Sequence, residues 1–393
     1  MNNIYGDSIL RVPALRGFLV DYYLAHLTHN LEPKTLLLLG PPGIGKSTAV
    51  REAGELIARS LGREFIVYSD NVAERILSSP SKYFVFVDLR LTEVEPTDLI
   101  GIPRDYKNYV MFKPLLWAYV LSQVPGILFL DEFTNIQRPD VQSIAFKIVY
   151  DRMAGFLKFR KDVLIIAAGN SPEYSSLASA QPAPLINRLL ILEIMTPTVD
   201  DWYKWMNETY GDKWEKAVYV YLKAYQDDFI SIPEDEESLE NFPTPRSWTG
   251  LALTLKIISI KDKTMLREII KGYLGKAVGN KFYEFYTAGL AMAKDILENP
   301  TILLNYRDNI DNVYASTLAL SYHIANMKMR EVMGKWKKIV RVMKILNDNF
   351  GAEMLIMFLR LILESNVGFI VLAMLVKELP SICEKVELLL REL

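Results

Sequence analysis

The feature that most constrains this chain is the segment 40–47, which reads GPPGIGKS. Its spacing, G-x-x-x-x-G-K-S, is that of a loop that cradles phosphate groups. The apolar run 35–39 precedes it and predicts a buried strand, and residues 48–53 predict the start of a helix. The motif requires this strand, loop and helix in this order. We therefore interpret the segment as a triphosphate site and not as a Gly/Pro-rich turn that happens to contain a lysine.

Each residue type in the loop has a chemical role. Glycines let backbone N–H groups turn toward phosphates without a Cβ clash, and the helix N-terminus adds a positive dipole end. We expect Lys46 to reach the β- and γ-phosphates and the Ser47 hydroxyl to ligate Mg²⁺. The predicted ligands are thus ATP and Mg²⁺. The predicted nucleotide-binding residues are Gly40, Pro41, Pro42, Gly43, Ile44, Gly45, Lys46, Ser47 and Thr48.

A second apolar run, 126–130, ends in two acids, Asp131 and Glu132. In a parallel sheet, the carboxyl end of this strand lies beside the phosphate loop. Asp131 is then expected to hold the Mg²⁺ shell, and Glu132 to orient and polarise the attacking water. The alternative is a strand followed by a helix-capping acid. The phosphate loop upstream favours the catalytic interpretation.

A third buried strand is predicted over 162–168 and ends at Gly169 and Asn170. An amide at this end of the sheet is placed to hydrogen-bond the water or the γ-phosphate. The alternative is that Asn170 only makes a turn. A last strand is predicted over 189–194. Strands that alternate with helices predict a parallel α/β sheet.

Composition limits the remaining possibilities. The 393 residues suffice for two or three domains, and 45 basic against 47 acidic residues argue against a dominant basic surface. The single cysteine, Cys383, fits a reducing compartment, and the first residues lack the pattern of a signal peptide. The apolar run 367–376 is too short to span a bilayer. These features predict a cytoplasmic protein without membrane insertion.

Helical patterns dominate from Val199 onward, and Asn299-Pro300 interrupts them. The predicted domains are therefore 1–197 (nucleotide-binding α/β), 198–299 (helical lid) and 300–393 (C-terminal helical domain). Arg246 is expected in the first turn of a helix, where a cation opposes the helix dipole. That cost suggests an anionic partner, with a plain surface arginine as the alternative.

The segment 328–344 is rich in basic residues, and we interpret it as a solvated helix face, with contact to nucleic acid as the alternative. Its basic residues are Lys328, Arg330, Lys335, Lys337, Lys338, Arg341 and Lys344.

Residues 31–248 resemble the AAA+ ATPases, and within them the MoxR-like group. Segments 40–47 and 127–132 look like Walker A and Walker B. Segment 131–135 is similar to the family's D-E-I-N-R pattern, with the arginine displaced to Arg138. Segment 168–172 resembles sensor 1, 185–188 the arginine-finger segment, 244–247 sensor 2, and 95–101 the pre-helix insert that contacts substrate.

The resemblance implies a parallel-sheet AAA+ P-loop core followed by an all-α lid, with an additional C-terminal helical region. It also implies a ring, usually of six subunits, in which Arg188 reaches the ATP of the neighbour and Arg246 acts in cis from the lid. The implied catalytic set is Lys46, Glu132, Asn170, Arg188 and Arg246, with Ser47 and Asp131 on the metal. MoxR-like proteins are regarded as chaperones, often with a von Willebrand A-domain partner.

The function that we favour from the sequence is an ATP-driven enzyme that remodels or chaperones a partner protein. A nucleic-acid motor or loader of helicase or translocase type is the first alternative, because the fold serves many functions. The second is a nucleotide-gated structural module, in which ATP only sets assembly.

Overall fold

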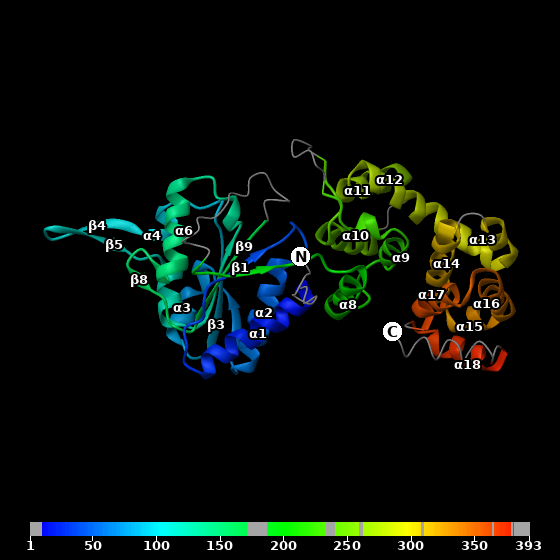
Figure 1. Ribbon diagram of the computed structural model, residues 1–393, viewed down its shortest axis with the longest axis horizontal. Coiled ribbons are helices and arrows are strands. Elements are labelled where there is room, and N and C mark those ends of the chain that lie inside the picture. The colour runs from blue at the N-terminus through cyan, green and yellow to red at the C-terminus, as the bar shows by residue number, and fades with distance from the viewer. Residues whose placement is uncertain are drawn as a thin grey trace, which may run out of the picture. The chain divides into compact units, whose positions relative to one another are not determined.

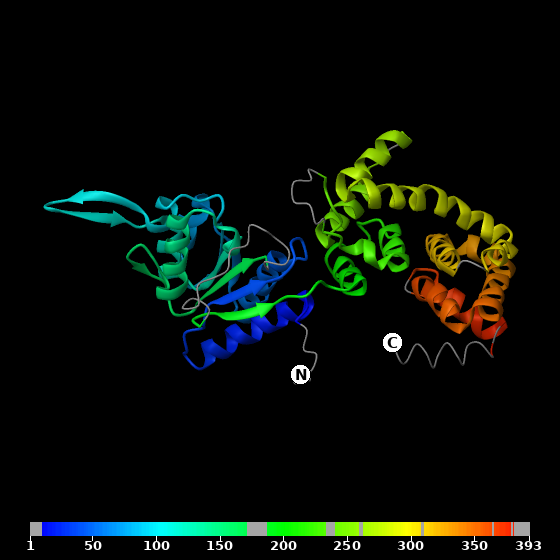
Figure 2. The same ribbon diagram turned by 45° about the horizontal axis from the view of Figure 1, so that its top comes forward.

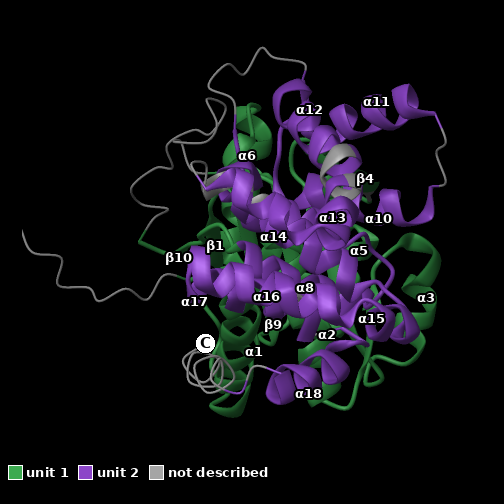
Figure 3. Cartoon of the chain, turned by 90° about the vertical axis from the view of Figure 1, so that its right-hand side faces the viewer, with its two compact units in different colours: residues 1–198 green, residues 199–393 purple. Residues whose placement is uncertain are grey.

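The computed structural model describes residues 10–170, 187–232, 240–258, 262–307, 310–363, 365–378 and 380. The chain divides into two compact units, Met1–Thr198 and Val199–Leu393, which are coloured separately in Figure 3. Each unit has its own hydrophobic core.

The first unit is built on a six-stranded sheet, all of whose pairings are parallel, in the order β10-β1-β9-β6-β3-β2. The strands are β1 (Leu36–Leu39), β2 (Glu64–Val67), β3 (Tyr83–Arg90), β6 (Gly126–Asp131), β9 (Val163–Gly169) and β10 (Leu190–Glu193). All seven residues of β9 are buried. A central parallel strand is covered on both faces, which explains its continuous apolar run. The predicted parallel α/β core is thus confirmed.

Helices cover both faces of this sheet, as Figures 1 and 2 show. They are α1 (Val12–Thr28), α2 (Lys46–Ser60), α3 (Asp70–Ser78), α4 (Thr97–Ile100), α5 (Leu116–Gln123) and α6 (Pro139–Asp151). Successive strand side chains point to opposite faces. Val85 packs in a cluster with residues of α5 and α6, whereas the ring of its neighbour Phe84 meets Tyr23 of α1 edge-on at 5.5 Å. The apolar spacing of residues 8–28 predicts a helix, and the observed helix α1 begins at Val12, with Pro13 in its first turn.

Two hairpins extend from this core. The longer pairs β4 (Ile102–Tyr106) with β5 (Tyr109–Lys113) and projects away from the sheet in Figure 1. The shorter pairs β7 (Met153–Ala154) with β8 (Leu157–Lys158). The rings of Phe112 and Phe156 lie 5.6 Å apart and join the two hairpins. The polar residues 104–108 thus belong to the outer half of a hairpin.

The second unit is helical throughout its described part. Its helices are α8 (Val199–Tyr210), α9 (Ala217–Ala224), α10 (Pro245–Ile257), α11 (Lys263–Leu274), α12 (Lys276–Glu284), α13 (Leu290–Glu298), α14 (Ile310–Ala325), α15 (Met329–Gly334), α16 (Trp336–Phe350), α17 (Ala352–Leu363) and α18 (Gly368–Glu378). Shorter turns lie at Gln226–Phe229, Phe285–Gly289 and Pro300–Tyr306. No helix in the described ranges is long and apolar enough to traverse a bilayer.

Two helix boundaries differ from the sequence prediction. The sequence pattern predicts one helix over 265–278, but this helix ends at Leu274, because Gly275 adopts φ +76°. A Cβ there would lie 2.3 Å from the carbonyl oxygen of Asn241. The pattern also predicts one helix over 331–346, whereas the structure has two helices, α15 and α16, which Lys335 separates.

Helix α9 links the two hydrophobic clusters of the second unit. Its residues 217–222 are all buried, and it packs on both α8 and α14. At its N-terminal end, Glu215 Oε1 accepts hydrogen bonds from the Ala217 N–H (3.1 Å) and from the Tyr322 hydroxyl of α14. The predicted division of this unit at Asn299 stays a prediction.

Removal of the Tyr322 hydroxyl is expected to destabilise the second unit. Tyr322→Phe leaves the half-buried Glu215 with a backbone donor alone, which costs about 1–2 kcal/mol. Urea unfolding followed by circular dichroism measures this loss. The matched control is Tyr314→Phe on the same helix, whose hydroxyl has no hydrogen bond to the described residues. Equal losses in the two variants would contradict the assigned role of this bond.

Candidate functional site

The loop between β1 and α2 has the backbone geometry of a phosphate cradle. Gly43 (φ 72°) and Gly45 (φ 101°) adopt left-handed conformations that residues with a Cβ rarely take. Helix α2 begins at Lys46, immediately after Gly45. The first N–H groups of a helix have no intrahelical acceptor, so they are free to bind an anion at this point.

The Lys46 ammonium group lies inside this loop. Its Nζ donates to the carbonyl oxygens of Gly40 at 2.7 Å and of Pro41 at 2.8 Å, and the residue is only 8% exposed. Burial of an ammonium group is costly unless hydrogen bonds or opposite charge compensate it, and these two carbonyl oxygens supply part of that compensation. The loop therefore presents a cation to an anionic ligand.

The two predicted metal ligands are in direct contact. Ser47 Oγ, in the first turn of α2, donates a hydrogen bond of 3.1 Å to Asp131 Oδ2 at the end of β6. Mg²⁺ prefers oxygen ligands, and it is usually held by one or two protein oxygens together with phosphates and water. This oxygen pair fits that chemistry. The described part of the chain contains no cluster of three or more His, Cys, Asp or Glu that would hold a metal by itself.

Glu132 adopts a left-handed conformation (φ 59°) directly after β6. Its carboxylate accepts a hydrogen bond from the Thr92 hydroxyl and lies 3.8 Å from Arg90 Nε. Arg90 in turn pairs with Glu93 at 2.6 Å. The sequence analysis did not identify Arg90 or Thr92. The feature that could have identified these two residues is their position at the end of β3, because the strand register pairs Arg90 with Asp131.

A third carboxylate, Asp88 of β3, was also missed. Partial burial and the nearby charge of Asp131 raise the pKa of Asp88, against the opposing charges of Arg90 and Arg51. Asp88 lies in the strand that pairs with β6. The feature that could have identified Asp88 is the presence of an acidic residue within the otherwise apolar run 83–89. Negative charge thus accumulates where the sequence predicts the metal.

Asn170 lies at the same edge of the sheet as the loop. Its N–H donates to Thr134 Oγ1 at 2.9 Å, and its carbonyl oxygen accepts from that hydroxyl at 3.1 Å. The register pairs Gly169 with Leu39, so Asn170 is level with Gly40. Thr134 belongs to the short helix Phe133–Asn135 and fixes the backbone of Asn170 beside the Glu132 turn. The geometry therefore brings together Lys46, Ser47, Asp131, Glu132 and Asn170.

Arg188 lies at the other end of the sheet. It precedes β10, whose first residue pairs with Leu36 at the start of β1. The phosphate loop, in contrast, follows the end of β1. The exposed Arg188 guanidinium lies over the ring of Tyr150, 4.8 Å from its centroid. The structure thus does not bring Arg188 to the loop of its own chain.

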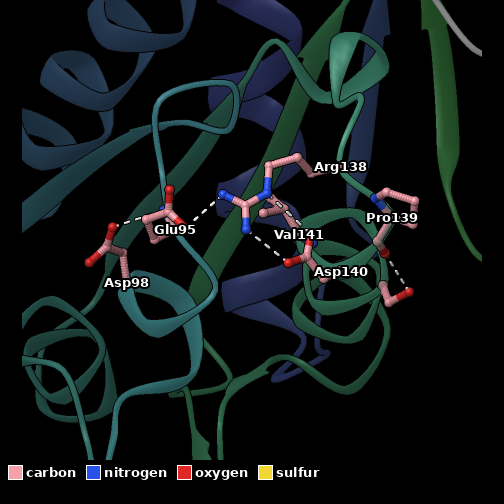
Figure 4. A network of polar contacts seen from close by, with 7 residues as sticks. Glu95, Asp98, Arg138, Pro139, Asp140 and Val141 are labelled. Atoms are coloured by element: carbon pink, nitrogen blue, oxygen red, sulfur yellow. Dashed lines mark hydrogen bonds and ion pairs between the residues drawn. The ribbon is translucent and has the colours of Figure 1, made fainter.

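Arg138 connects the start of α6 to the base of the long hairpin (Figure 4). Its guanidinium binds Glu95 Oε2 at 2.6 Å and Asp140 Oδ2 at 2.9 Å. The Glu95 N–H donates to Asp98 at 2.9 Å. Arg138 therefore ties the segment after Glu132 to the segment that carries β4 and β5.

Arg246 belongs to the second unit. It is exposed and follows Pro245 in the first turn of α10, which a capping box of Thr244 and Ser247 begins. Its predicted action on the nucleotide stays a prediction. Residues 171–186, which include part of the sensor 1 and arginine-finger segments, lie outside the described residues.

Comparison with solved structures finds matches at low similarity. The Thermotoga maritima RuvB Holliday junction branch migration motor is 16% identical, with 73% of this chain and 76% of that chain covered and a TM-score of 0.30. NtrX from Brucella abortus in complex with ADP is 18% identical (66% and 52% covered, TM-score 0.35). The Aeropyrum pernix ORC1 protein in complex with DNA is 14% identical (86% and 85% covered, TM-score 0.34). A search of curated proteins found no match.

A family model assigns the core of the first unit. Residues 36–181 match the family AAA, described as the ATPase family associated with various cellular activities. This span begins at β1 and contains the phosphate loop, the Asp131-Glu132 turn and Asn170. The parallel sheet and the grouping of these residues agree with the match, and residues 36–181 therefore form an AAA ATPase-family domain.

Proposed function

We propose that the protein is a Mg²⁺-dependent ATPase that works as a ring, in the manner of the MoxR-like group, to remodel a partner protein. The observation that carries the ATPase proposal is the contact between Ser47 and Asp131, with the buried Lys46 and Glu132 at the same edge of the sheet. An ATP site needs these groups together, because phosphoryl transfer depends on positioning and charge neutralisation.

Each residue at the site has a separate role in the proposed hydrolysis. Lys46 leaves its two carbonyl partners and neutralises charge on the β- and γ-phosphates. Ser47 and Asp131 would hold Mg²⁺, which would supply further neutralisation of phosphate charge. Glu132 polarises the attacking water, and Asn170 orients it. Because Thr92 and Arg90 bind the Glu132 carboxylate, Glu132 must leave them to reach the water.

Arg188 supports a ring in which subunits complete each other's sites. It lies at the opposite end of the sheet from its own phosphate loop, so a role for Arg188 in hydrolysis requires the loop of a neighbour. A head-to-tail contact that closes into a ring provides that arrangement for every subunit. We expect six subunits, with Arg246 acting in cis from the lid.

The long hairpin supports a protein as the client. Ile102, Val110 and Met111 are 49%, 57% and 49% exposed, which is unusual for apolar side chains on a projecting element. The segment 92–95 contacts Glu132 through Thr92 and Arg138 through Glu95, and it leads into this hairpin. Movement of Glu132 during hydrolysis would thus reach the hairpin. A von Willebrand A-domain protein is the partner that we expect.

The first prediction concerns the water-activating acid. Glu132→Gln is expected to bind ATP but to hydrolyse it about 10²–10⁴-fold more slowly, because a general base is lost. Fluorescent ATP titration and phosphate release measure the two quantities separately. Lys46→Ala is the comparison variant, and it is expected to lose ATP binding as well. Normal turnover by Glu132→Gln would remove Glu132 from the mechanism.

The second prediction tests action of Arg188 between subunits. Arg188→Ala and Glu132→Gln are each expected to be nearly inactive, since an arginine finger contributes about 10³–10⁵ in rate. A one-to-one mixture is expected to regain activity, because about one site in four then has Glu132 of one subunit and Arg188 of the next. Phosphate release from the mixture measures this recovery. If Arg188 acts within its own chain, no mixture regains activity.

The third prediction concerns the hairpin. Glu132→Gln with ATP is expected to trap the client, and the added changes Val110→Ser and Met111→Ser are expected to release it, because they remove the apolar contact surface. Affinity capture followed by mass spectrometry compares the two variants. The matched control adds Ile257→Ser and Met265→Ser, two exposed apolar residues of the second unit. Hairpin-dependent capture of nucleic acid without protein would favour the nucleic-acid motor instead.

A further inference from the structure

Helix α16 carries a row of exposed basic residues that the proposed ATPase cycle does not use. Lys337, Arg341 and Lys344 are all exposed. At 100° per residue, these three positions fall within an arc of about 60°, and they extend over about 10 Å of the helix axis. They therefore form one face, here called the α16 basic face (α16 is labelled in Figure 3).

The neighbouring basic residues are neutralised, whereas the α16 basic face is not. Lys335 and Lys338 both bind the carboxylate of Glu298 on α13, Lys335 at 2.5 Å. These two hydrogen bonds hold the pKa of Glu298 at about 2. Within the described part of the chain, Lys337, Arg341 and Lys344 have no ion pair. The acid nearest to them along the helix is Asp348, one turn beyond Lys344 and within the same arc, so this side of α16 carries three positive charges against one negative charge.

Positive charge extends to the adjacent helices. Burial and the charges of Lys294 on α13 and Lys335 lower the pKa of His323 on α14, and Glu331 opposes this shift only in part. One carboxylate, that of Glu298, serves two lysines and leaves a net positive charge beside the α16 basic face. The surface thus favours an anionic partner.

The apolar residues of α16 decide which kind of anionic partner fits. Ile339, Val340, Val342, Met343 and Leu346 are all buried in the core of the second unit. No residue of α16 is among the exposed large apolar residues of the described chain. A helix that binds a membrane surface needs an outward apolar face, and the core of a protein interface is also apolar. A polyphosphate backbone can bind without any apolar surface on the protein.

We propose that the α16 basic face binds the phosphate backbone of nucleic acid. This binding is independent of sequence, because side chains that contact phosphates carry no base readout. It also requires no nucleotide, because none of the three residues belongs to the ATP site. The proposal goes beyond the remodelling function and does not depend on it.

The test compares two charge reversals in the full chain. The test variant carries Lys337→Glu, Arg341→Glu and Lys344→Glu. The control carries Lys213→Glu, Lys263→Glu and Lys377→Glu, which are exposed lysines elsewhere in the second unit, so both variants have the same net charge. Lys337 lies in the first turn of α16, where glutamate favours the helix dipole, so the test variant is expected to fold. A triple change to glutamine provides a second, milder test variant.

The probe is a fluorescein-labelled DNA duplex of about 30 base pairs and mixed sequence, with binding followed by anisotropy from about 50 to 200 mM salt. Three phosphate contacts contribute a slope of about −2.7 in log K against log salt, or about a 40-fold loss of affinity over this range. We expect the test variant to bind at least about tenfold more weakly at low salt, with a slope shallower by about three. The control is expected to keep the affinity and the slope of the unmodified protein.

Several results would overturn the proposal. They are the absence of duplex binding by the unmodified protein, unchanged binding by both test variants, and an equal loss in the control variant. Loss of binding to phosphatidylserine vesicles with unchanged DNA binding would assign the face to membranes instead. Phosphate release without DNA is measured in parallel and is expected to be unchanged in all variants. A failure of DNA binding therefore leaves the proposed ATPase function standing.

Discussion

The parallel register of the sheet is the constraint on which the site depends. Every strand of the main sheet runs in the same direction, so the carboxyl ends of β1, β6 and β9 lie at one edge. Pairing of Leu39 with Gly169 and of Leu130 with Ala167 brings three loops together there. A shift of the strand pairing by one residue would move the side chains on one face of each strand to the other face. The core therefore fixes the position of Ser47 against Asp131 before any ligand binds.

This edge also concentrates features that cost stability. Lys46 is a buried cation, Gly45 and Glu132 have left-handed backbones, and Asp88 lies near Asp131. A left-handed backbone is natural for glycine, but at a residue with a Cβ such as Glu132 it costs about 1–3 kcal/mol and persists only where the surrounding structure holds it. The fully buried β9 and the apolar residues packed around it supply that support. An anionic ligand with its metal would offset the electrostatic part of this cost, which arises from Lys46, Asp88 and Asp131.

The sequence was most informative for structural elements that the residues of one continuous segment determine. Apolar runs predicted β1, β6 and β9 within a residue or two, and the polar residues that follow them lie together at one edge of the sheet. Arg90, Thr92 and Asp88 were missed because their relation to Glu132 arises from the pairing of β3 with β6, about 40 residues apart. The break at Gly275 was missed for a similar reason, since the carbonyl group that crowds it belongs to Asn241. Local sequence patterns thus locate strands and loops, whereas the pairing of distant segments determines which charged residues contact each other.

The contacts that join the proposed ATP site to the segment leading into the hairpin are weak, as a switch requires. The pair of Arg138 and Glu95 and the pair of Arg90 and Glu132 are both about half exposed, and such pairs contribute at most about 1 kcal/mol. A ligand shifts a two-state equilibrium only by its difference in affinity for the two states. Because little energy opposes the release of Glu132 from Thr92 and Arg90, a modest preference of bound ATP for the released carboxylate would move the segment 92–95. A buried, fully satisfied network at this place would hold the hairpin in one position through the whole cycle.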